Sequence, residues 1–167
     1  MNRVSFQGER GAYSESAAIV FFGNKVETIP CTTFADALKN TENDTSDYSI
    51  LPVENSLEGS VGESIDLLLS TNLNVVGEIY HRIHHCLIGT GPLAEIEVVY
   101  SHPQALGQCR QFIQENELEI MPTTDTAGSV QMIRDLHHDS SACIASKEAA
   151  KIYDVPVIQE GIEDNAN

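Results

Sequence analysis

The chain has 167 residues, of which 41% are hydrophobic and 20% are charged, so it has the composition of a globular protein that buries a sizeable core in one domain or in two small lobes. No stretch is long and apolar enough to span a bilayer, which favours a soluble protein. The net charge of −16 argues against nucleic acid and anionic membrane surfaces as partners, because like charges repel.

Short apolar runs alternate with helical patterns from one end of the chain to the other. The expected strands cover residues 3–7, 26–30, 48–53, 75–88, 96–101, 119–123, 142–145 and 155–159. The expected helices cover residues 14–22, 33–40, 61–70, 103–115, 126–137 and 147–153. This order predicts an α/β fold in which mostly parallel sheets carry flanking helices. The chain enters its first strand without an apolar leader or a transit segment, so we expect a cytoplasmic location.

Residues 75–89 form one apolar-rich segment that is longer than an ordinary strand. We interpret it as a crossing between two lobes, with residues 155–163 as the return crossing. The first lobe would then contain residues 1–78 and 158–167, and the second lobe residues 79–157. Two lobes joined by two strands would leave a cleft at their hinge, which is a common place for a small-molecule site.

An apolar run stops abruptly where an acid, an amide and a hydroxyl follow one another at Glu54, Asn55 and Ser56. The run before them predicts a buried strand, and the spacing of Ser60 and Glu63 is typical of a capping box that opens a helix. The three polar side chains would then lie at the carboxyl end of a strand, beside a helix start. Ligands bind at this edge in open α/β sheets.

A glycine-containing turn follows the first strand, with Gly8 and Gly11 placed just before a helix. The turn lacks the Gly-Lys-Ser/Thr of a P-loop and the third glycine of a dinucleotide fingerprint, so a nucleotide is not indicated. It is either a tight structural turn or a place where backbone N–H groups approach an anion.

A second polar helix start follows the strand that ends at Ser101. Ser101 and Gln104 have the spacing of a capping box, and a proline lies in the first turn, where its missing N–H does no harm. Gln108 lies one turn beyond Gln104 on the same helix face. The two amides either face a ligand or form an exposed polar face.

A third polar helix start comes from residues 123–129, Thr-Thr-Asp-Thr-Ala-Gly-Ser. The segment places hydroxyls and a carboxylate where the next helix begins. The alternative to a ligand site is that Asp125 or Thr126 serves as a plain N-cap.

The histidines and cysteines do not have the spacing of a metal or redox centre. On an extended strand His81 and His85 face one side and His84 the other, so we expect packing, hydrogen bonding or a protonatable wall instead of a metal site. No Ser-His-Asp triad is evident from the spacing. The four cysteines contain no Cys-x-x-Cys pair and are expected to be buried reduced thiols: Cys31, Cys86, Cys109 and Cys143.

Five motifs follow one another in an order that resembles the catalytic domain of prephenate dehydratase over essentially the whole chain. Residues 6–14, Phe-Gln-Gly-Glu-Arg-Gly-Ala-Tyr-Ser, are similar to the opening Phe-x-Gly-x-x-Gly-x-Tyr-Ser of that family, and residues 51–60 resemble its Pro-Ile/Val-Glu-Asn-Ser signature. The other three matches are residues 85–87, 100–109 and 125–127. Chance can produce one short match but not five in the same order.

The resemblance implies two lobes similar to the type II periplasmic-binding-protein architecture, with prephenate in the cleft between them. The family reaction removes water and carbon dioxide together to give phenylpyruvate, on the route to phenylalanine, and no metal or organic cofactor is expected. The implied catalytic residues are Glu54, Asn55 and Gln108. The implied substrate-binding residues are Gly11, Tyr13, Ser14, Ser56, Ser101, His102, Gln104, Asp125, Thr126, Ala127 and Asn165.

Family members continue from a segment like residues 162–167 into a threonine-arginine-phenylalanine tripeptide and a final strand. This sequence stops before the tripeptide, so we expect a truncated chain without the threonine that the family uses as its principal catalytic residue. We expect no ACT regulatory domain within these residues. Family members commonly pair, which implies a homodimer or homotetramer.

Two alternatives stay open at the level of the sequence. The closely related substrate arogenate differs from prephenate only at the keto or amino group of its side chain, so an arogenate dehydratase fits the same motifs. A non-catalytic module that binds an aromatic or dicarboxylate ligand fits a chain that lacks the threonine.

Overall fold

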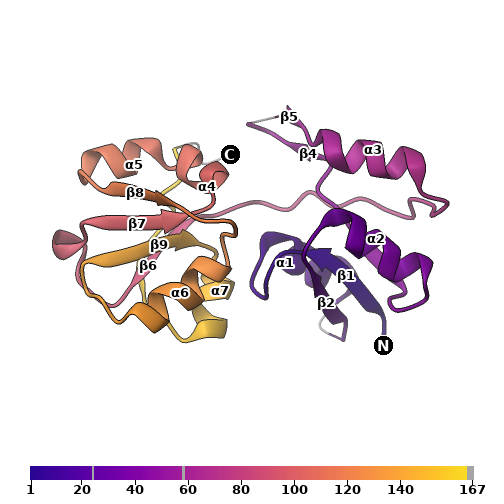
Figure 1. Cartoon of the computed structure of the whole chain (residues 1–167), viewed down its shortest axis with the longest axis horizontal. Helices are drawn as coiled ribbons and strands as arrows, with labels where there is room; N and C mark the ends of the chain where they lie inside the picture. Colours follow the sequence, from indigo (N-terminus) through magenta and orange to yellow (C-terminus); the bar gives the residue numbers. More distant parts are fainter. Residues whose placement is uncertain (24, 58, 165–167) are drawn as a thin grey trace. The chain divides into compact units, whose positions relative to one another are not determined.

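A computed structural model describes residues 1–23, 25–57 and 59–164 of the chain. The chain forms two compact units (Figure 1). The first unit contains Met1–Glu9 and Tyr13–His81, and the second contains Arg10–Ala12 and the chain from Arg82 onward. The two units are described separately below.

The first unit is built on a parallel sheet of three strands in the order β2-β1-β3. Its strands are β1 (Arg3–Gln7), β2 (Glu27–Cys31) and β3 (Tyr48–Ile50), and its two helices between strands are α1 (Tyr13–Phe22) and α2 (Phe34–Glu42). The middle residues of the central strand β1 are fully buried, as expected for a strand with a neighbour on each side.

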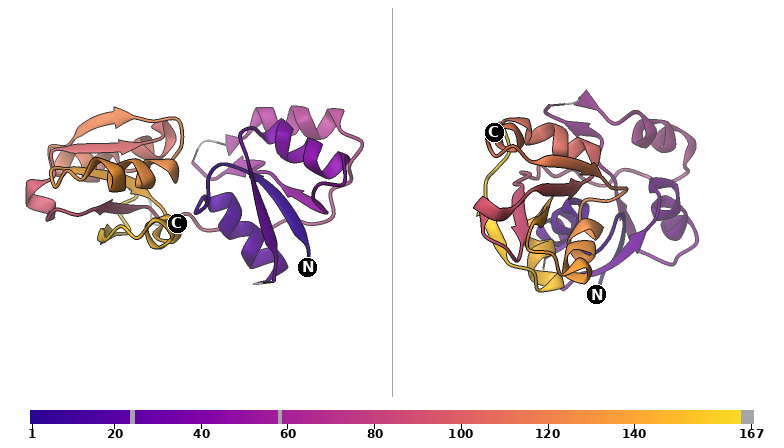
Figure 2. Two further views of the ribbon diagram at one scale, coloured as in Figure 1. Left: turned by 60° about the horizontal axis from the view of Figure 1, so that its bottom comes forward. Right: turned by 60° about the vertical axis from the view of Figure 1, so that its left-hand side comes forward.

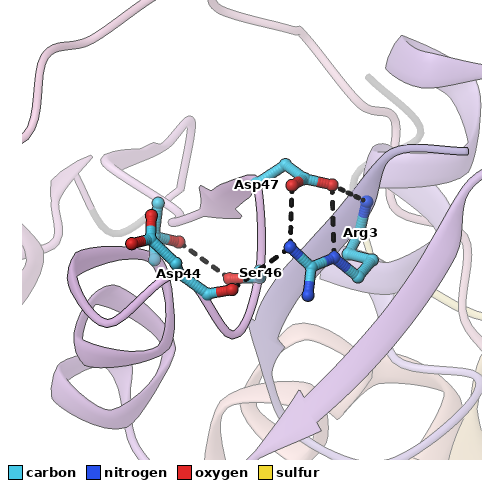
Figure 3. Close-up of polar contacts among 5 residues, drawn as sticks. Arg3, Asp44, Ser46 and Asp47 are labelled. Carbon is cyan, nitrogen blue, oxygen red and sulfur yellow. Dashed lines mark hydrogen bonds and ion pairs between the residues drawn. The ribbon is translucent and has the colours of Figure 1, made fainter.

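A guanidinium ties the start of β1 to the loop before β3 (Figure 3). Arg3 Nη2 donates to Asp47 Oδ1 at 2.9 Å and to the Asp44 carbonyl at 3.2 Å, and Arg3 N donates to Asp47 Oδ2 at 2.8 Å. The hydrogen bonds from Arg3 lower the pKa of the Asp47 carboxyl. Both side chains are about 40% exposed, so salt weakens the pair and its role is to hold the local backbone.

The rest of the first unit contains a short antiparallel pair and one helix. The pair is β4 (Glu54–Asn55) with β5 (Gly59–Ser60), and the helix is α3 (Gly62–Ser70). Residues 71–85, all of which the structure describes, contain no helix or strand and run as an extended trace (Figures 1 and 2).

The second unit contains a mixed sheet of five strands in the order β10-β6-β9-β7-β8. Strand β7 is parallel to both β8 and β9, whereas β6 is antiparallel to β9 and to β10. The strands are β6 (Cys86–Gly89), β7 (Val98–Ser101), β8 (Glu119–Pro122), β9 (Ser141–Ala145) and β10 (Val157–Glu160). The helices are the 3₁₀ turn η1 (Leu93–Glu95), α4 (Pro103–Gln108), α5 (Arg110–Glu115), α6 (Gly128–Leu136) and α7 (Lys147–Tyr153).

The central strand β9 separates two apolar cores in the second unit. Ala142 and Ile144 pack with residues of α4 and α5, whereas Cys143 and Ala145 pack with residues of α6 and α7. This alternation follows from the pleat of a strand, which sends successive side chains to opposite faces. One pair of helices therefore covers each face of the sheet (Figure 1).

The α/β class with flanking helices is confirmed, and three details of the sequence prediction need correction. The strand expected over 75–88 is a strand only over Cys86–Gly89, and Val75 and Val76 are more than 70% exposed. The helix expected over 103–115 is divided at Cys109 into α4 and α5. Residues 158–164, expected in the first lobe, belong to the second unit because β10 pairs with β6.

Candidate active site

Several polar residues predicted from the sequence lie at one edge of the sheet in the second unit. Strands β7, β8 and β9 are parallel, so their carboxyl ends meet at the same edge. Ser101 ends β7, residues 123–127 follow β8, and Ser146 follows β9. His85 precedes β6, whose first residue pairs with the last residue of β9. We call these residues, together with Gln108 and Glu163 that contact His85, the polar edge.

Ser101 closes β7 and is fully buried. Its hydroxyl donates to the carbonyl oxygen of Ile144 at 2.7 Å, and so joins two neighbouring strands. The predicted capping box is wrong because the N-cap of α4 is His102, whose Nδ1 accepts a hydrogen bond from Gln104 N at 3.2 Å. The capping box predicted from Ser60 is also wrong, because Ser60 lies in β5 and α3 begins without a side-chain cap.

Gln108 and His85 form a close contact at the polar edge. His85 Nε2 and Gln108 Oε1 are 2.7 Å apart, and His85 is only 2% exposed. Gln104, one turn earlier on α4, is exposed. The structure thus separates two amides that the sequence placed together: one lies against a buried imidazole, and the other belongs to an exposed residue.

Glu163 and Asp164 are site residues that the sequence analysis missed. Glu163 accepts hydrogen bonds from His85 N at 2.9 Å and contacts His84 Nδ1 at 2.8 Å. Asp164 accepts from Arg110 N and Gln111 N, at 3.1 and 2.9 Å, and so caps α5. Sequence patterns are local and could not reveal these contacts, since Glu163 and His85 are 78 positions apart.

Burial and hydrogen bonds shift the pKa values of His85 and Glu163 in defined directions. Burial lowers the pKa of His85 below its ordinary 6.5, although its contacts with Gln108 and the nearby carboxylate of Glu163 act in the opposite direction. Burial alone would raise the pKa of Glu163, but hydrogen bonds from its own backbone, from His85 N–H and from His84 outweigh burial and lower it. His85 is therefore neutral and Glu163 ionised near pH 7.

The lowered pKa of His85 predicts a loss of stability as the pH falls. Below about pH 6.5 the unfolded chain takes up a proton at His85 while the folded chain does not, so the unfolding free energy falls toward the folded pKa. A His85→Gln variant lacks this titration, and its unfolding free energy should fall less between about pH 7 and about pH 5. Urea unfolding at several pH values measures the difference. The exposed His138→Gln is the control, and equal pH slopes for wild type and His85→Gln would contradict the prediction.

Asp125 organises the turn between β8 and α6. Its Oδ2 accepts a hydrogen bond from Gly128 N, and its backbone carbonyl accepts from Ser129 Oγ at 2.7 Å. Thr123 Oγ1 lies 2.7 Å from the same serine hydroxyl. The N-cap of α6 is Ala127 and not Asp125 or Thr126 as predicted, although the Asp125 carboxylate accepts from the first N–H of that helix.

The segment Arg10–Ala12 belongs to the second unit, where it lies against the start of α7. Ser146 Oγ donates to the Gly11 carbonyl at 2.6 Å and accepts from Ala149 N at 2.9 Å, so one hydroxyl caps α7 and anchors the turn. Gly8 and Gly11 both have positive φ, which confirms the tight turn. Ser146 was missed, although a serine between a strand and a helix is a recognisable N-cap signal.

The remaining predicted site residues that the structure describes belong to the first unit. Tyr13 and Ser14 open α1, and both are half-buried. Glu54 and Asn55 lie in β4, where they pair with β5 instead of ending a long buried strand. The side chain of Asn55 accepts a hydrogen bond from Leu57 N at 2.9 Å and so shapes the turn that contains Ser56. Asn165 lies outside the described residues.

Residues 1–23, 25–57 and 59–164 contain no group of three or more His, Cys, Asp or Glu side chains able to hold a metal ion. Nor do they contain a helix with the length and apolar character needed to cross a membrane. Cys86, Cys109 and Cys143 are buried free thiols, and Cys31 is half-buried. Burial raises the pKa of Cys86 to about 11, so this thiol is protonated and unreactive near pH 7.

The fold and the polar edge define an α/β protein of the class that gathers polar groups at the carboxyl ends of parallel strands. The sequence profile of the family described as prephenate dehydratase matches residues 4–167. The chain belongs to the prephenate dehydratase family.

Individual relatives agree with this assignment. Arogenate dehydratase/prephenate dehydratase 2, chloroplastic, of Arabidopsis thaliana is 40% identical over 167 residues, which cover 99% of this chain and 44% of the relative. The chain therefore spans about half the length of the curated relatives it matches.

Two solved structures have the same fold. One is GqqA, described as a novel type of quorum quenching acylase, with a TM-score of 0.89 and 33% identity over 97% of this chain and 60% of that one. The other is the prephenate dehydratase of Arthrobacter aurescens in complex with L-Phe, with a TM-score of 0.87 and 27% identity over 98% of this chain and 56% of that one.

Proposed function

We propose that the protein to which this chain belongs catalyses the decarboxylative dehydration of prephenate to phenylpyruvate, water and carbon dioxide. The observation that carries the proposal is the family match over residues 4–167, which includes the motifs that build the polar edge. No metal or organic cofactor enters the proposed reaction. The product is a precursor of phenylalanine.

The chemistry of the reaction fits amides and hydroxyls better than strong acids. The ring of prephenate gains aromaticity as its carboxylate leaves, so the enzyme must mainly orient the ring and assist the departure of hydroxide. Gln108 supplies an amide for this purpose from the second unit. Glu54 and Asn55, carried over from the family motif, are proposed to position the substrate or its leaving hydroxyl, and Thr126 to hold a carboxylate.

Local donors must bind an anion despite the overall charge of the chain. Prephenate carries two carboxylates, and the net charge of −16 repels it. The carboxylates at the polar edge are already engaged, because Asp125 accepts from Gly128 N and Glu163 from His85 N. Hydrogen-bond donors that remain at helix starts and on amides then attract the substrate with few cations.

The direct test measures phenylpyruvate by its ultraviolet absorbance after addition of prephenate to the full-length protein. Acid-catalysed background is subtracted. Gln108→Ala should lower kcat/KM by about 100-fold, which is the scale expected for loss of one oriented donor at a reacting centre. The matched control is Gln114→Ala, which removes an exposed amide from the neighbouring helix α5 and should keep wild-type kcat/KM.

Three other results would contradict the proposal. Binding of prephenate without turnover by the full-length protein would support a non-catalytic binding module. Amide hydrolysis without phenylpyruvate formation would point to a reaction like that of the acylase. Equal kcat/KM values for Gln108→Ala and wild type would remove Gln108 from the reaction.

Arogenate is a second candidate substrate, favoured by the name of the Arabidopsis relative. The two substrates share the ring and the leaving group, so the same polar groups would serve both reactions. The ratio of kcat/KM for prephenate to kcat/KM for arogenate decides between them. A ratio below one would make arogenate dehydration the main activity.

The proposals for the enzyme's location, partners and oligomeric state rest on the net charge of the chain and on the family to which it belongs. We propose a cytoplasmic enzyme that acts on a small dianion as a homodimer or homotetramer, without nucleic acid or membrane partners. Light scattering of the full-length protein measures the assembly.

A further inference from the structure

We propose that His85, Glu163 and Asp164 are positioning residues that hold the Gln108 amide with its carbonyl oxygen turned inward and its NH₂ group available to the ligand. The inference rests on the proposed function, in which Gln108 contacts the substrate. It goes beyond that function because none of the three residues needs to touch the substrate.

The first step is the contact between the imidazole of His85 and the side chain of Gln108. A glutamine amide has an oxygen that accepts and a nitrogen that donates two hydrogen bonds. His85 Nε2 lies 2.7 Å from the oxygen, so Nε2 carries the hydrogen and the oxygen accepts it. The acceptor side of the amide is thereby used inside the protein, and the donor side is directed elsewhere.

The second step is the tight hold on the backbone of His85. Its N–H donates to Glu163 Oε2 at 2.9 Å, and its carbonyl accepts from Gly161 N and Ile162 N at 3.0 and 3.2 Å. The Glu163 side chain is only 7% exposed, and Ile162 is 4% exposed. Residues 161–163 therefore hold both the backbone N–H and the backbone carbonyl of His85, and so fix the position from which its side chain extends.

The third step is the contact between Asp164 and the backbone of Gln108. Asp164 N donates to the backbone carbonyl of Gln108 at 2.8 Å, while the Asp164 carboxylate caps the first N–H groups of α5. Glu163 and Asp164 are neighbours in sequence, so one dipeptide holds the backbone of Gln108 and the backbone of the histidine that orients its side chain. The ring of contacts runs Glu163, His85, Gln108, Asp164 and back to Glu163.

This closed ring has a chemical consequence. A surface glutamine samples both orientations of its amide, and a reversed amide would present its oxygen to an anionic substrate and repel it. The closed set of contacts through Glu163, His85, Gln108 and Asp164 excludes the reversed amide orientation before the substrate binds. The cost of ordering the amide is then met during folding and not during binding.

Kinetics of the full-length protein test the inference through two substitutions of one residue. His85→Met removes the donor and should lower kcat/KM by about tenfold or more, because misplacing a group near the chemistry is costly. His85→Gln keeps a donor where Nε2 lies and should restore most of the rate. In a Gln108→Ala background, His85→Met should change kcat/KM by less than about twofold, because the two residues act as one unit.

A matched pair of substitutions, Glu163→Ala and Glu160→Ala, tests the role of Glu163. Glu163→Ala should also lower kcat/KM, and it too should have no further effect in the Gln108→Ala background. Glu160→Ala removes an exposed carboxylate three residues earlier, whose partner is Lys147, and should retain the wild-type value. Additive losses for His85→Met and Gln108→Ala, or equal values for His85→Met and His85→Gln, would overturn the inference.

A second measurement does not depend on activity. Long-range ¹H–¹⁵N correlation spectra of the ¹⁵N-labelled protein should show His85 protonated at Nε2, and the Gln108 NH₂ signals should shift in His85→Met but not in His85→Gln. An unprotonated Nε2 would overturn the inference even in an active enzyme. If the wild type shows the expected spectra but forms no phenylpyruvate, the proposed function fails while the orientation of the amide stands.

Discussion

Replacing Gly11 by alanine is expected to destabilise the second unit by about 3 kcal/mol, from left-handed backbone strain and overpacking together. The φ of Gly11 is +91°, a conformation that residues with a Cβ rarely adopt. An added Cβ would also lie 2.5 Å from Ala149 Cα and 2.7 Å from Ala149 Cβ, and backbone atoms at the start of α7 cannot move aside freely. The substitution therefore acts on the anchor that Ser146 provides for this turn.

Hydrogen exchange of the β9 amides under mild urea measures this effect on the second unit alone. The control is Gly107→Ala in α4, where an added Cβ meets nothing within 4 Å. Alanine favours a helix over glycine, so this control should be neutral or slightly stabilising. If both alanine variants give the same exchange rates, the close approach of Gly11 to Ala149 does not contribute to stability.

Ile144→Ala should cost about 3 kcal/mol, within the range for removing a large buried aliphatic side chain. Ile144 is fully buried on the central strand β9, in the core that contains Leu87, Val99 and Leu106. It has strands on both sides, so the space left by three carbons cannot be filled by a small shift. The same exchange measurement reports the loss, and Ile144→Val should show a smaller one.

Ile120→Ala is the matched control for a shortened isoleucine. Ile120 lies on the edge strand β8 and is 44% exposed, so its truncation leaves little new cavity and should cost less than about 1 kcal/mol. If the two alanine variants are equally destabilised, the central position of β9 is not what makes Ile144 important.

The alternation of elements could be predicted from the sequence because burial repeats with a regular period. The strands expected at 3–7, 119–123 and 142–145 agree with β1, β8 and β9 within a residue. The expectation failed at Val75 and Val76, which have strand-forming side chains but are exposed and pair with no strand in the described chain. Propensity identifies residues that suit a strand, whereas a strand exists only when a neighbour supplies hydrogen bonds.

The polar edge could be predicted in outline but not in detail. The motifs at Ser101, Gln108 and Asp125 do lie at one sheet edge, because parallel strands bring their ends together. The capping box at Ser101 failed because the N-cap of α4 is the next residue, His102, whose Nδ1 accepts the hydrogen bond from Gln104 N. Glu163 escaped prediction because its partners come from a distant part of the chain.

Alkylation of the chain's own thiols can detect partial unfolding. Cys31 is half-buried in the first unit, whereas Cys86, Cys109 and Cys143 are buried in the second, where burial raises their pKa values. Alkylation requires an exposed thiolate, so the second-unit thiols become reactive only when the cores that enclose them open. Alkylation of Cys86, Cys109 or Cys143 therefore reports that the second unit has opened, without any engineered probe.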